Sequence, residues 1–175
     1  VPAERQILVR HLFTHTSGLS YGEIIVGPSD VSKMYDDLGL FGFDEPTDQK
    51  MANLASVPLR AQPGSEFNYS MGTDVLGALI ERISGMSLGA YMEKNIFTPL
   101  GMNDTGFYIP AGKRDRVVAL FEPKRVTVQV PGQTKSFVPS TNQNYCNVEP
   151  RFQSGGAGLC STVDDYSKFM TALLN

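Results

Sequence analysis

A tyrosine, Tyr69, lies just before the most strongly periodic apolar segment of the sequence. A Pro-Gly turn at 63–64 and a short aromatic run lead into it, and residues 73–84 then carry apolar side chains at helical spacing, followed by Gly85. The positive end of a helix dipole favours an anion. A phenol at this point could therefore give up its proton and serve as a proton acceptor. Tyr69 is the first candidate for a catalytic residue.

Two other groups of polar residues lie near helix ends. His11 and His15 are spaced i, i+4, but the segment between them lacks the glutamate of a zinc-protease motif, so contacts with the last carbonyls of a helix are the better interpretation. Ser70 and Thr73 are interpreted as helix caps. Ser70 has no lysine three residues later and no G-x-S-x-G elbow around it, which argues against a nucleophile.

Composition bounds the class of protein. The chain has 175 residues, 41% of them hydrophobic, and a formal net charge of −3, so a strongly basic nucleic-acid surface is not indicated. No apolar run approaches the roughly 18 residues of a membrane span. Cys146 and Cys160 cannot form a zinc site alone; two unpaired thiols are the simplest interpretation, and a disulfide is possible if the protein is exported.

The elements that must position these residues are mostly helices. Periodicity and caps predict helices over 7–15, 31–38 (capped by Ser29 or Asp30), 48–56 (capped by Thr47), 73–84, 88–95 (capped by Ser87) and a last helix after Ser161 or Thr162. Runs rich in β-branched residues at 117–122, 126–130 and 134–138 predict two or three short strands. We expect residues 1–175 to form a single, mainly α domain with a small β-hairpin or short antiparallel strands around 117–138.

A glycine-rich stretch, Ser154-Gly155-Gly156-Ala157-Gly158, precedes the last helix. No lysine follows at phosphate-loop spacing, so it is not a nucleotide site. Two interpretations stay open for Gly155, Gly156 and Gly158: backbone positions with positive φ, or a cleft wall close to a substrate.

Three segments have a distinctive order and spacing: VRHLFTHTSGL at 9–19, residues 63–85 together with PLGMNDTGF at 99–107, and residues 154–165. Together they resemble the serine β-lactamase and penicillin-binding-protein superfamily, in its class C-like branch of esterases and D-amino-acid peptidases. The resemblance covers nearly the whole chain. It implies the mainly helical region of a β-lactamase-like α/β fold, with most of the central sheet outside this sequence.

The resemblance also implies three catalytic motifs: S-x-x-K with the nucleophilic serine, Tyr-x-Asn with a tyrosine as base, and a K-T-G or H-x-G strand. Only the second is present, as Tyr69-Ser70-Met71, and Met71 in place of asparagine tilts the expectation toward an esterase. The nearest match to S-x-x-K ends at Lys50, on a helix that we interpret as surface-exposed. Tyr145-Cys146-Asn147 is a literal Tyr-x-Asn in unmatched surroundings.

The missing motifs fall where such proteins carry them, before residue 9 and after the last helix. We therefore expect the chain to be the middle of a longer protein, inactive alone. The resemblance implies a bacterial serine hydrolase that acts on a small-molecule ester, lactam or D-amino-acid peptide, needs no metal or organic cofactor, and is periplasmic or secreted, with cytosolic esterases as exceptions. Ser20, Tyr21, Gly155 and Gly156 are the expected substrate-binding residues.

Two rival hypotheses remain. The first is a non-catalytic β-lactamase-like module that binds peptidoglycan peptides or a protein partner. The second is a self-standing helical domain of unrelated function. If the protein is instead an inactive homologue, Tyr69 would only pack a turn onto the following helix.

Overall fold

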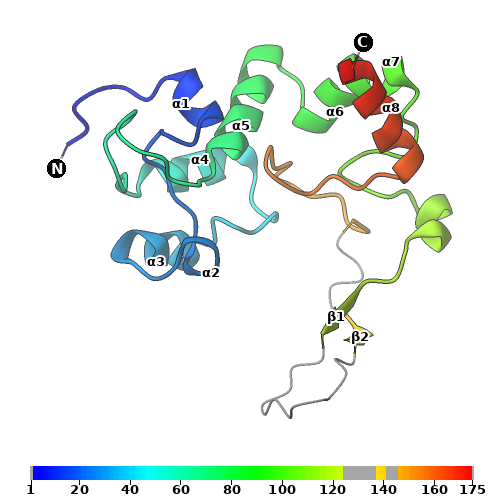
Figure 1. The fold of residues 1–175 in the computed structure, drawn as a ribbon, viewed down its shortest axis with the longest axis horizontal. Helices are drawn as coiled ribbons and strands as arrows, with labels where there is room; N and C mark the ends of the chain where they lie inside the picture. Colours follow the sequence, from blue (N-terminus) through cyan, green and yellow to red (C-terminus); the bar gives the residue numbers. More distant parts are fainter. Residues whose placement is uncertain (1, 124–136, 141–145, 175) are drawn as a thin grey trace.

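Helix α5 (Gly72–Ser84) is the element around which the chain is arranged in the computed structural model, which describes residues 2–123, 137–140 and 146–174. Figure 1 shows α5 standing between two groups of helices. One group holds α1 (Val9–Phe13), α2 (Glu23–Val26), α3 (Asp30–Asp37) and α4 (Thr47–Ala55). The other holds α6 (Leu88–Met92), a π-helical turn (Glu93–Phe97), α7 (Thr98–Leu100) and α8 (Val163–Leu174).

Two short strands project away from the helices. Strand β1 (Phe121–Pro123) follows a 3₁₀ turn (Ala111–Arg116) and pairs antiparallel with β2 (Phe137–Pro139), so that Glu122 lies opposite Val138. The prediction of a mainly α structure with a short antiparallel pair is confirmed. The strand predicted at 126–130 lies outside the described residues. Within the described residues, no helix has the length and apolar character to cross a membrane.

The predicted caps explain where several helices begin. Ser29 Oγ accepts from the Ser32 N–H at 3.0 Å, and Ser87 Oγ accepts from the Ala90 N–H at 3.2 Å. Thr162 Oγ1 accepts from the Asp165 N–H at 3.2 Å at the start of α8. Each side chain satisfies a backbone donor that has no partner within its helix. At the other end of α5, Gly85 adopts a left-handed conformation (φ 68°), as predicted.

Other helix boundaries differ from the prediction. The first helix is shorter than 7–15, because the chain leaves helical geometry after Phe13 and His15 takes a positive φ of 52°. The caps predicted at Ser70 and Thr73 are wrong: Met71 occupies the cap position of α5, with no side-chain cap bond. Helix α2 lies between the first two predicted helices, in a stretch where no helix is predicted.

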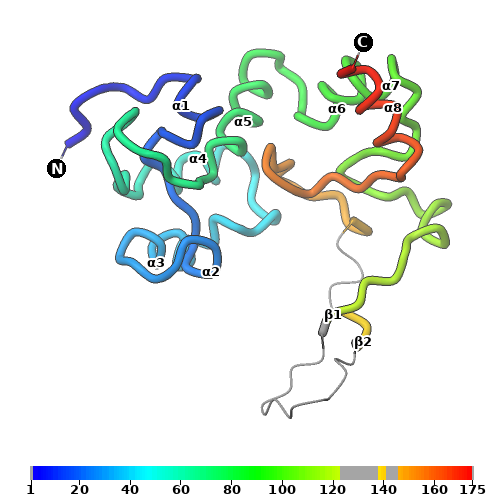
Figure 2. Tube along the Cα trace, in the orientation of Figure 1, coloured from blue at the N-terminus to red at the C-terminus, as the bar shows by residue number. Residues whose placement is uncertain are grey.

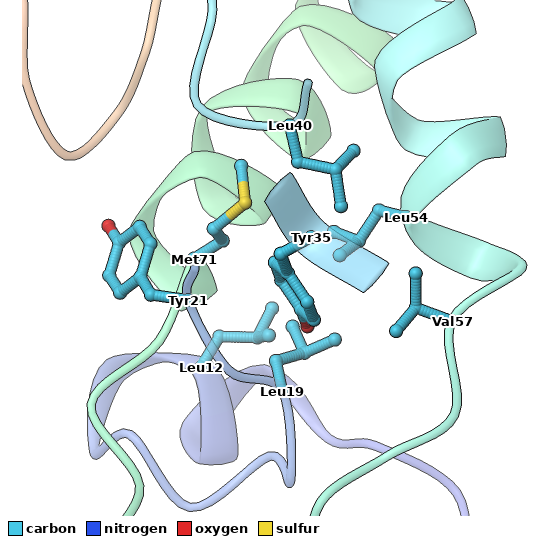
Figure 3. Close-up of a cluster of buried hydrophobic side chains, with 8 residues drawn as sticks. All are labelled: Leu12, Leu19, Tyr21, Tyr35, Leu40, Leu54, Val57 and Met71. Carbon is cyan, nitrogen blue, oxygen red and sulfur yellow. The ribbon is translucent and has the colours of Figure 1, made fainter. Parts of the chain in front are cut away.

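The main hydrophobic core lies at the N-terminal end of α5 (Figure 3). It joins side chains from α1, α3 and α4 to the segments that follow α1, α4 and residue 70. Each fully buried aliphatic or aromatic side chain contributes about 1.5–3 kcal/mol. The core also contains a directed contact, because the Ser20 N–H donates to the Tyr35 hydroxyl at 2.9 Å. Its members are Leu12, Leu19, Tyr21, Tyr35, Leu40, Leu54, Val57 and Met71.

Glycines let backbone segments approach α5 closely. A Cβ on Gly72 would lie 2.7 Å from the Leu12 carbonyl oxygen of α1. A Cβ on Gly77 would lie 3.0 Å from the Leu88 side chain and 3.3 Å from the Gly155 nitrogen. Figure 2 shows the segment before α8, drawn in orange, returning from the hairpin to lie beside α5. Helix α5, which lies in the second of the three segments that resemble the superfamily, therefore contacts the first and the third.

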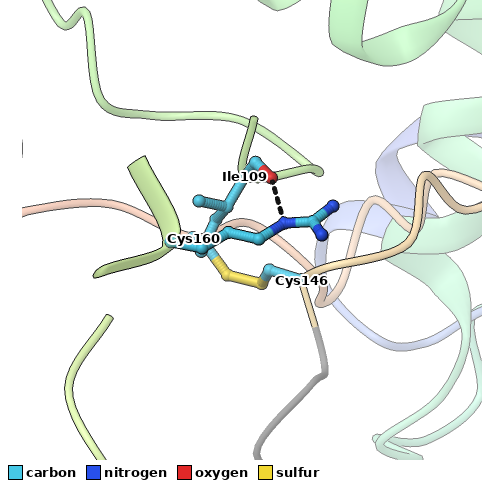
Figure 4. Close-up of a disulfide and its surroundings, with 4 residues drawn as sticks. Ile109, Cys146 and Cys160 are labelled. Atoms are coloured by element: carbon cyan, nitrogen blue, oxygen red, sulfur yellow. Dashed lines mark hydrogen bonds between the residues drawn. A yellow bond between two sulfur atoms is a disulfide. The ribbon is translucent and has the colours of Figure 1, made fainter. Parts of the chain in front are cut away.

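Cys146 and Cys160 form a disulfide (Figure 4). The interpretation of two unpaired thiols is therefore wrong. Backbone pairing brings the two cysteines together: Cys160 forms an antiparallel bridge with Gly106, and the Ile109 N–H donates to the Cys146 carbonyl at 2.8 Å. Both cysteines thus flank residues 106–109, and sequence spacing alone carries no sign of that arrangement.

Candidate active site

The segment that carries Tyr69 is fastened to the chain that follows α1. The Gly64 N–H donates to the Thr16 carbonyl at 2.7 Å, and the Asn68 N–H donates to the His15 carbonyl at 2.7 Å. Just past Tyr69, the Met71 N–H donates to the Ser20 carbonyl at 3.2 Å. These backbone bonds fix where the phenol can lie before α5 begins.

Tyr69 itself is half-exposed, with 50% of its surface accessible. Its ring lies between two others: the His15 ring centroid is 4.8 Å away and the Tyr21 ring centroid is 5.3 Å away. Phe67 extends the row beyond His15 at 5.9 Å, and Phe41 extends it beyond Tyr21 at 6.0 Å. Aromatic pairs at such distances favour defined orientations. The phenol is therefore held from both sides while it remains open to solvent.

The Ser70 side chain points into the protein, away from solvent. It is fully buried, and its Oγ lies 3.3 Å from His15 Nδ1. The Ser70 N–H also lies within hydrogen-bonding distance of the same nitrogen, at 3.3 Å. Because Ser70 is closed off from solvent, it cannot reach a substrate, and the pair with His15 acts to hold the turn before α5.

A buried carboxylate, Asp74, lies in the first turn of α5, shortly after Tyr69 in the chain. The Tyr21 hydroxyl donates to Asp74 Oδ2 at 3.3 Å, and the Ser154 hydroxyl donates to Asp74 Oδ1. Burial raises the pKa of the Asp74 carboxyl, although hydrogen bonds from Ser154 and Tyr21 oppose the shift. Burial also raises the pKa of Tyr21, with further contributions from Asp74 and Tyr69, so Tyr21 is a neutral donor at pH 7.

The glycine-rich stretch packs directly on this carboxylate. A Cβ on Gly155 would overlap the Thr73 carbonyl oxygen, and a Cβ on Gly156 would lie 2.8 Å from Thr73 Oγ1 and 3.3 Å from the Tyr21 hydroxyl. Of the three glycines in this stretch, only Gly158 has a positive φ, of 94°. The interpretation of all three as positive-φ positions is thus wrong for Gly155 and Gly156, where close approach is the constraint.

Four of the five predicted site residues come together here. Tyr69, Tyr21, Gly155 and Gly156 surround the first turn of α5. Ser20 is also nearby but buried, and its hydroxyl donates to the Tyr21 carbonyl at 3.4 Å rather than facing solvent. Sequence reasoning missed Asp74 and Ser154, since an acidic residue in a first helical turn is most simply a dipole partner.

Lys50 was also misinterpreted. The helix that carries it was predicted to be surface-exposed, yet the Lys50 side chain has no accessible surface. Its ammonium donates to the Leu40 carbonyl at 3.0 Å and lies 5.1 Å from the Phe152 ring centroid. Burial lowers the pKa of Lys50, although the charges of Glu45 and Asp74 oppose the shift. Lys50 therefore links the loop after α3 to the segment before the glycine-rich stretch.

Two large cavities lie elsewhere. One, of about 1120 Å³, lies between α6, residues 103–110 and the disulfide. The other, of about 1110 Å³, is a mainly apolar groove between α1, α4 and α5. Neither is lined by Tyr69 or by the residues around it. The arrangement thus presents a half-exposed Tyr69 phenol, and its neighbour Tyr21 is held by a buried hydrogen bond to Asp74.

Comparisons with known proteins identify the family of the chain. Residues 1–175 match the Beta-lactamase family. The chain is 38% identical over 176 residues to an uncharacterized protein of Mycobacterium tuberculosis, covering 99% of this chain and 40% of that protein. It is 36% identical over 188 residues to Esterase EstB of Burkholderia gladioli, covering 98% of this chain and 45% of the esterase.

A solved structure also matches. The structure of EstCE1, described as a hydrolase with promiscuous acyltransferase activity, aligns with a TM-score of 0.73 and 30% identity over 95% of this chain and 45% of that one. The chain thus spans less than half the length of the relatives that it matches. By its sequence and by its fold, the chain belongs to the Beta-lactamase family.

Proposed function

We propose that this chain supplies the proton-transfer tyrosine of a serine hydrolase, which transfers an acyl group through a serine ester. Tyr69 accepts the proton of the nucleophile, or of the water that releases the acyl group, and returns a proton to the leaving group. The observation that carries the proposal is the half-exposed phenol held between the His15 and Tyr21 rings. The nucleophilic serine and its lysine belong to the S-x-x-K motif, which does not occur within residues 1–175.

A small-molecule ester is the proposed substrate class. Met71 occupies the third position of the Tyr69-Ser70-Met71 motif, where penicillin-hydrolysing proteins carry asparagine. The names of the two relatives whose activity is stated, an esterase and a hydrolase with acyltransferase activity, support the same choice. The exposed Gly155 and Gly156 form the proposed boundary of the substrate cleft, and the buried Ser20 and Tyr21 support it from inside the fold.

The test compares the full-length protein with its Tyr69→Phe variant on a short-chain nitrophenyl ester. Loss of a general base costs about 10²–10⁴-fold in rate, so kcat/KM should fall by that factor. Tyr166→Phe is the matched control, because Tyr166 is an exposed tyrosine on α8 away from the site and should keep full activity. A Tyr69→Phe variant with unchanged kcat/KM would refute the role of Tyr69.

A second measurement separates an enzyme from a binding module. A fluorophosphonate probe forms a covalent bond with an activated serine, so the active full-length protein should be labelled at one serine upstream of this region. A protein that is folded, hydrolyses no ester and takes no label would instead support the non-catalytic module.

We also propose that the protein is exported. The disulfide between Cys146 and Cys160 supports this location, because disulfides persist in oxidising compartments. Fractionation of source cells should recover the protein with both thiols oxidised outside the cytosol, and recovery from the cytosol with reduced thiols contradicts the proposal.

A further inference from the structure

Asp74 is an unusual group to bury in a helix. Only 3% of its surface is accessible, and no salt bridge to it is formed within residues 2–123, 137–140 and 146–174. The Lys50 ammonium acts on the Asp74 charge only from beyond ion-pair distance, and a buried carboxylate outside an ion pair is costly unless hydrogen bonds satisfy its oxygens. Here two hydroxyl donors do so, one on each oxygen. The fold thus retains a carboxylate whose burial is unfavourable in the first turn of α5, next to the candidate active site.

The two donors come from distant parts of the chain. Tyr21 lies 53 positions before Asp74, and Ser154 lies 80 positions after it. The Tyr21 ring contacts the Tyr69 ring, at a centroid distance of 5.3 Å. Ser154 Oγ in turn accepts from the N–H groups of Gly156 and Ala157, at 3.0 and 2.9 Å. Asp74 therefore fixes both the Tyr21 ring, which contacts Tyr69, and, through Ser154, the backbone of the glycine-rich stretch.

The hydrogen-bond donors around position 74 explain why a carboxylate fits there better than an amide. A serine hydroxyl has one proton and two lone pairs, and both lone pairs of Ser154 are engaged by backbone donors. Its proton must then go to an acceptor, which is Asp74 Oδ1. Tyr21 also donates, to Oδ2. The two donors approach different oxygens of the carboxylate, and an asparagine at position 74 offers an acceptor at only one of these two places.

We propose that Asp74 is a positioning residue for the acyl-transfer reaction, which fixes the Tyr69 phenol through Tyr21 and fixes the backbone of 155–157 through Ser154. The inference rests on the proposed function, in which Tyr69 transfers the proton. In an Asp74→Asn variant the amide oxygen keeps the bond from Ser154, since Ser154 cannot accept from an amide. The amide nitrogen then faces Tyr21, whose hydroxyl must accept from it instead of donating to a charged oxygen, and this weaker neutral bond holds the Tyr21 ring less firmly against Tyr69.

The experiment measures kcat and KM of the full-length protein on a nitrophenyl ester for Asp74→Asn, Tyr21→Phe and the double variant. A misplacement of about 1 Å costs up to about 10²-fold, so each single variant should lower kcat by about tenfold to a hundredfold. KM should change far less, because the loss falls on the transition state. Asp164→Asn, an exposed carboxylate in the first turn of α8, is the matched control and should keep its kcat.

The double variant separates positioning from general loss of stability. If Tyr21 acts through Asp74, then adding Tyr21→Phe to Asp74→Asn should lower kcat no further, whereas independent effects multiply. Multiplying losses, or single variants with kcat within twofold of the parent, overturn the inference. Should Asp74→Asn fail to fold, Tyr21→Phe alone decides, because it leaves the bond between Ser154 and Asp74 in place.

Tyr69→Phe, measured alongside, distinguishes the two levels of the proposal. A loss of activity in Tyr69→Phe with unchanged kcat in Tyr21→Phe refutes the positioning role alone. Unchanged activity in Tyr69→Phe refutes the proposed function itself, and the positioning role with it.

Discussion

Replacing both Cys146 and Cys160 with serine should destabilise the protein by about 3 kcal/mol. The disulfide closes a sequence separation of 14 residues, and in the chain-entropy account a loop of about 15 residues corresponds to about 3 kcal/mol. The native backbone contacts remain in the variant, since the bridge between Gly106 and Cys160 and the bond from Ile109 to the Cys146 carbonyl use main-chain atoms only. The effect therefore arises in the unfolded chain, which gains the freedom that the disulfide removes.

The assay is urea unfolding of the full-length protein, followed by circular dichroism with and without a reducing agent. The expected loss corresponds to roughly a hundredfold change in the unfolding equilibrium, since 1.4 kcal/mol is about tenfold. Reductant should lower the midpoint of the parent and leave that of the double serine variant unchanged. Mass spectrometry under non-reducing conditions verifies the bond. If the bond is present and reductant moves neither midpoint, the entropic reasoning is refuted.

Two further perturbations test the buried lysine and the exposed ion cluster. Lys50→Met should lower the free energy of unfolding, measured in urea, by about 2–3 kcal/mol, because the buried Leu40 carbonyl loses a charged donor. Lys33→Met, at an exposed position of α3, is the control. Equal stability of the two variants would contradict this reasoning. Hydrogen bonds from Arg116 and Lys113 lower the pKa of Asp104, so its contribution to stability is complete above the ordinary carboxyl pKa and is lost as the pH falls toward the lowered value. The thermal midpoint of the parent should therefore exceed that of Asp104→Asn at pH 7, and the difference should shrink below about pH 4; a difference independent of pH would contradict the linkage.

Local chemistry made much of the fold predictable. Ser29, Ser87 and Thr162 cap their helices by accepting from an N–H only three residues away, so the signal and the structure lie in the same short stretch. The helix predicted at 73–84 is observed as Gly72–Ser84, with Gly85 closing it. Tyr69 could be singled out for the same reason, because its place before a periodic segment is a local property.

The support beneath Tyr69 could not be predicted in this way. Asp74 and Lys50 are polar residues at helical positions, where exposure to solvent is the ordinary expectation. Both are buried because their partners come from elsewhere: Ser154 lies 80 positions from Asp74, and Leu40 lies 10 positions from Lys50 across a loop. Likewise, Ser70 faces His15, 55 positions away, instead of capping α5. Tertiary contacts of this kind leave no periodic trace in the sequence.

The close approach of Gly155 to Thr73 limits which substitutions position 155 can accept. Because the contact joins backbone to backbone, no choice of side chain at 155 can preserve it, and even one added methyl group must push the two segments apart. A saturation library at this position should therefore return almost only the parent residue. Ala157 already carries a Cβ on the same turn. Substitutions at position 157 are therefore expected to leave intact the spacing that joins α5 to the segment before α8.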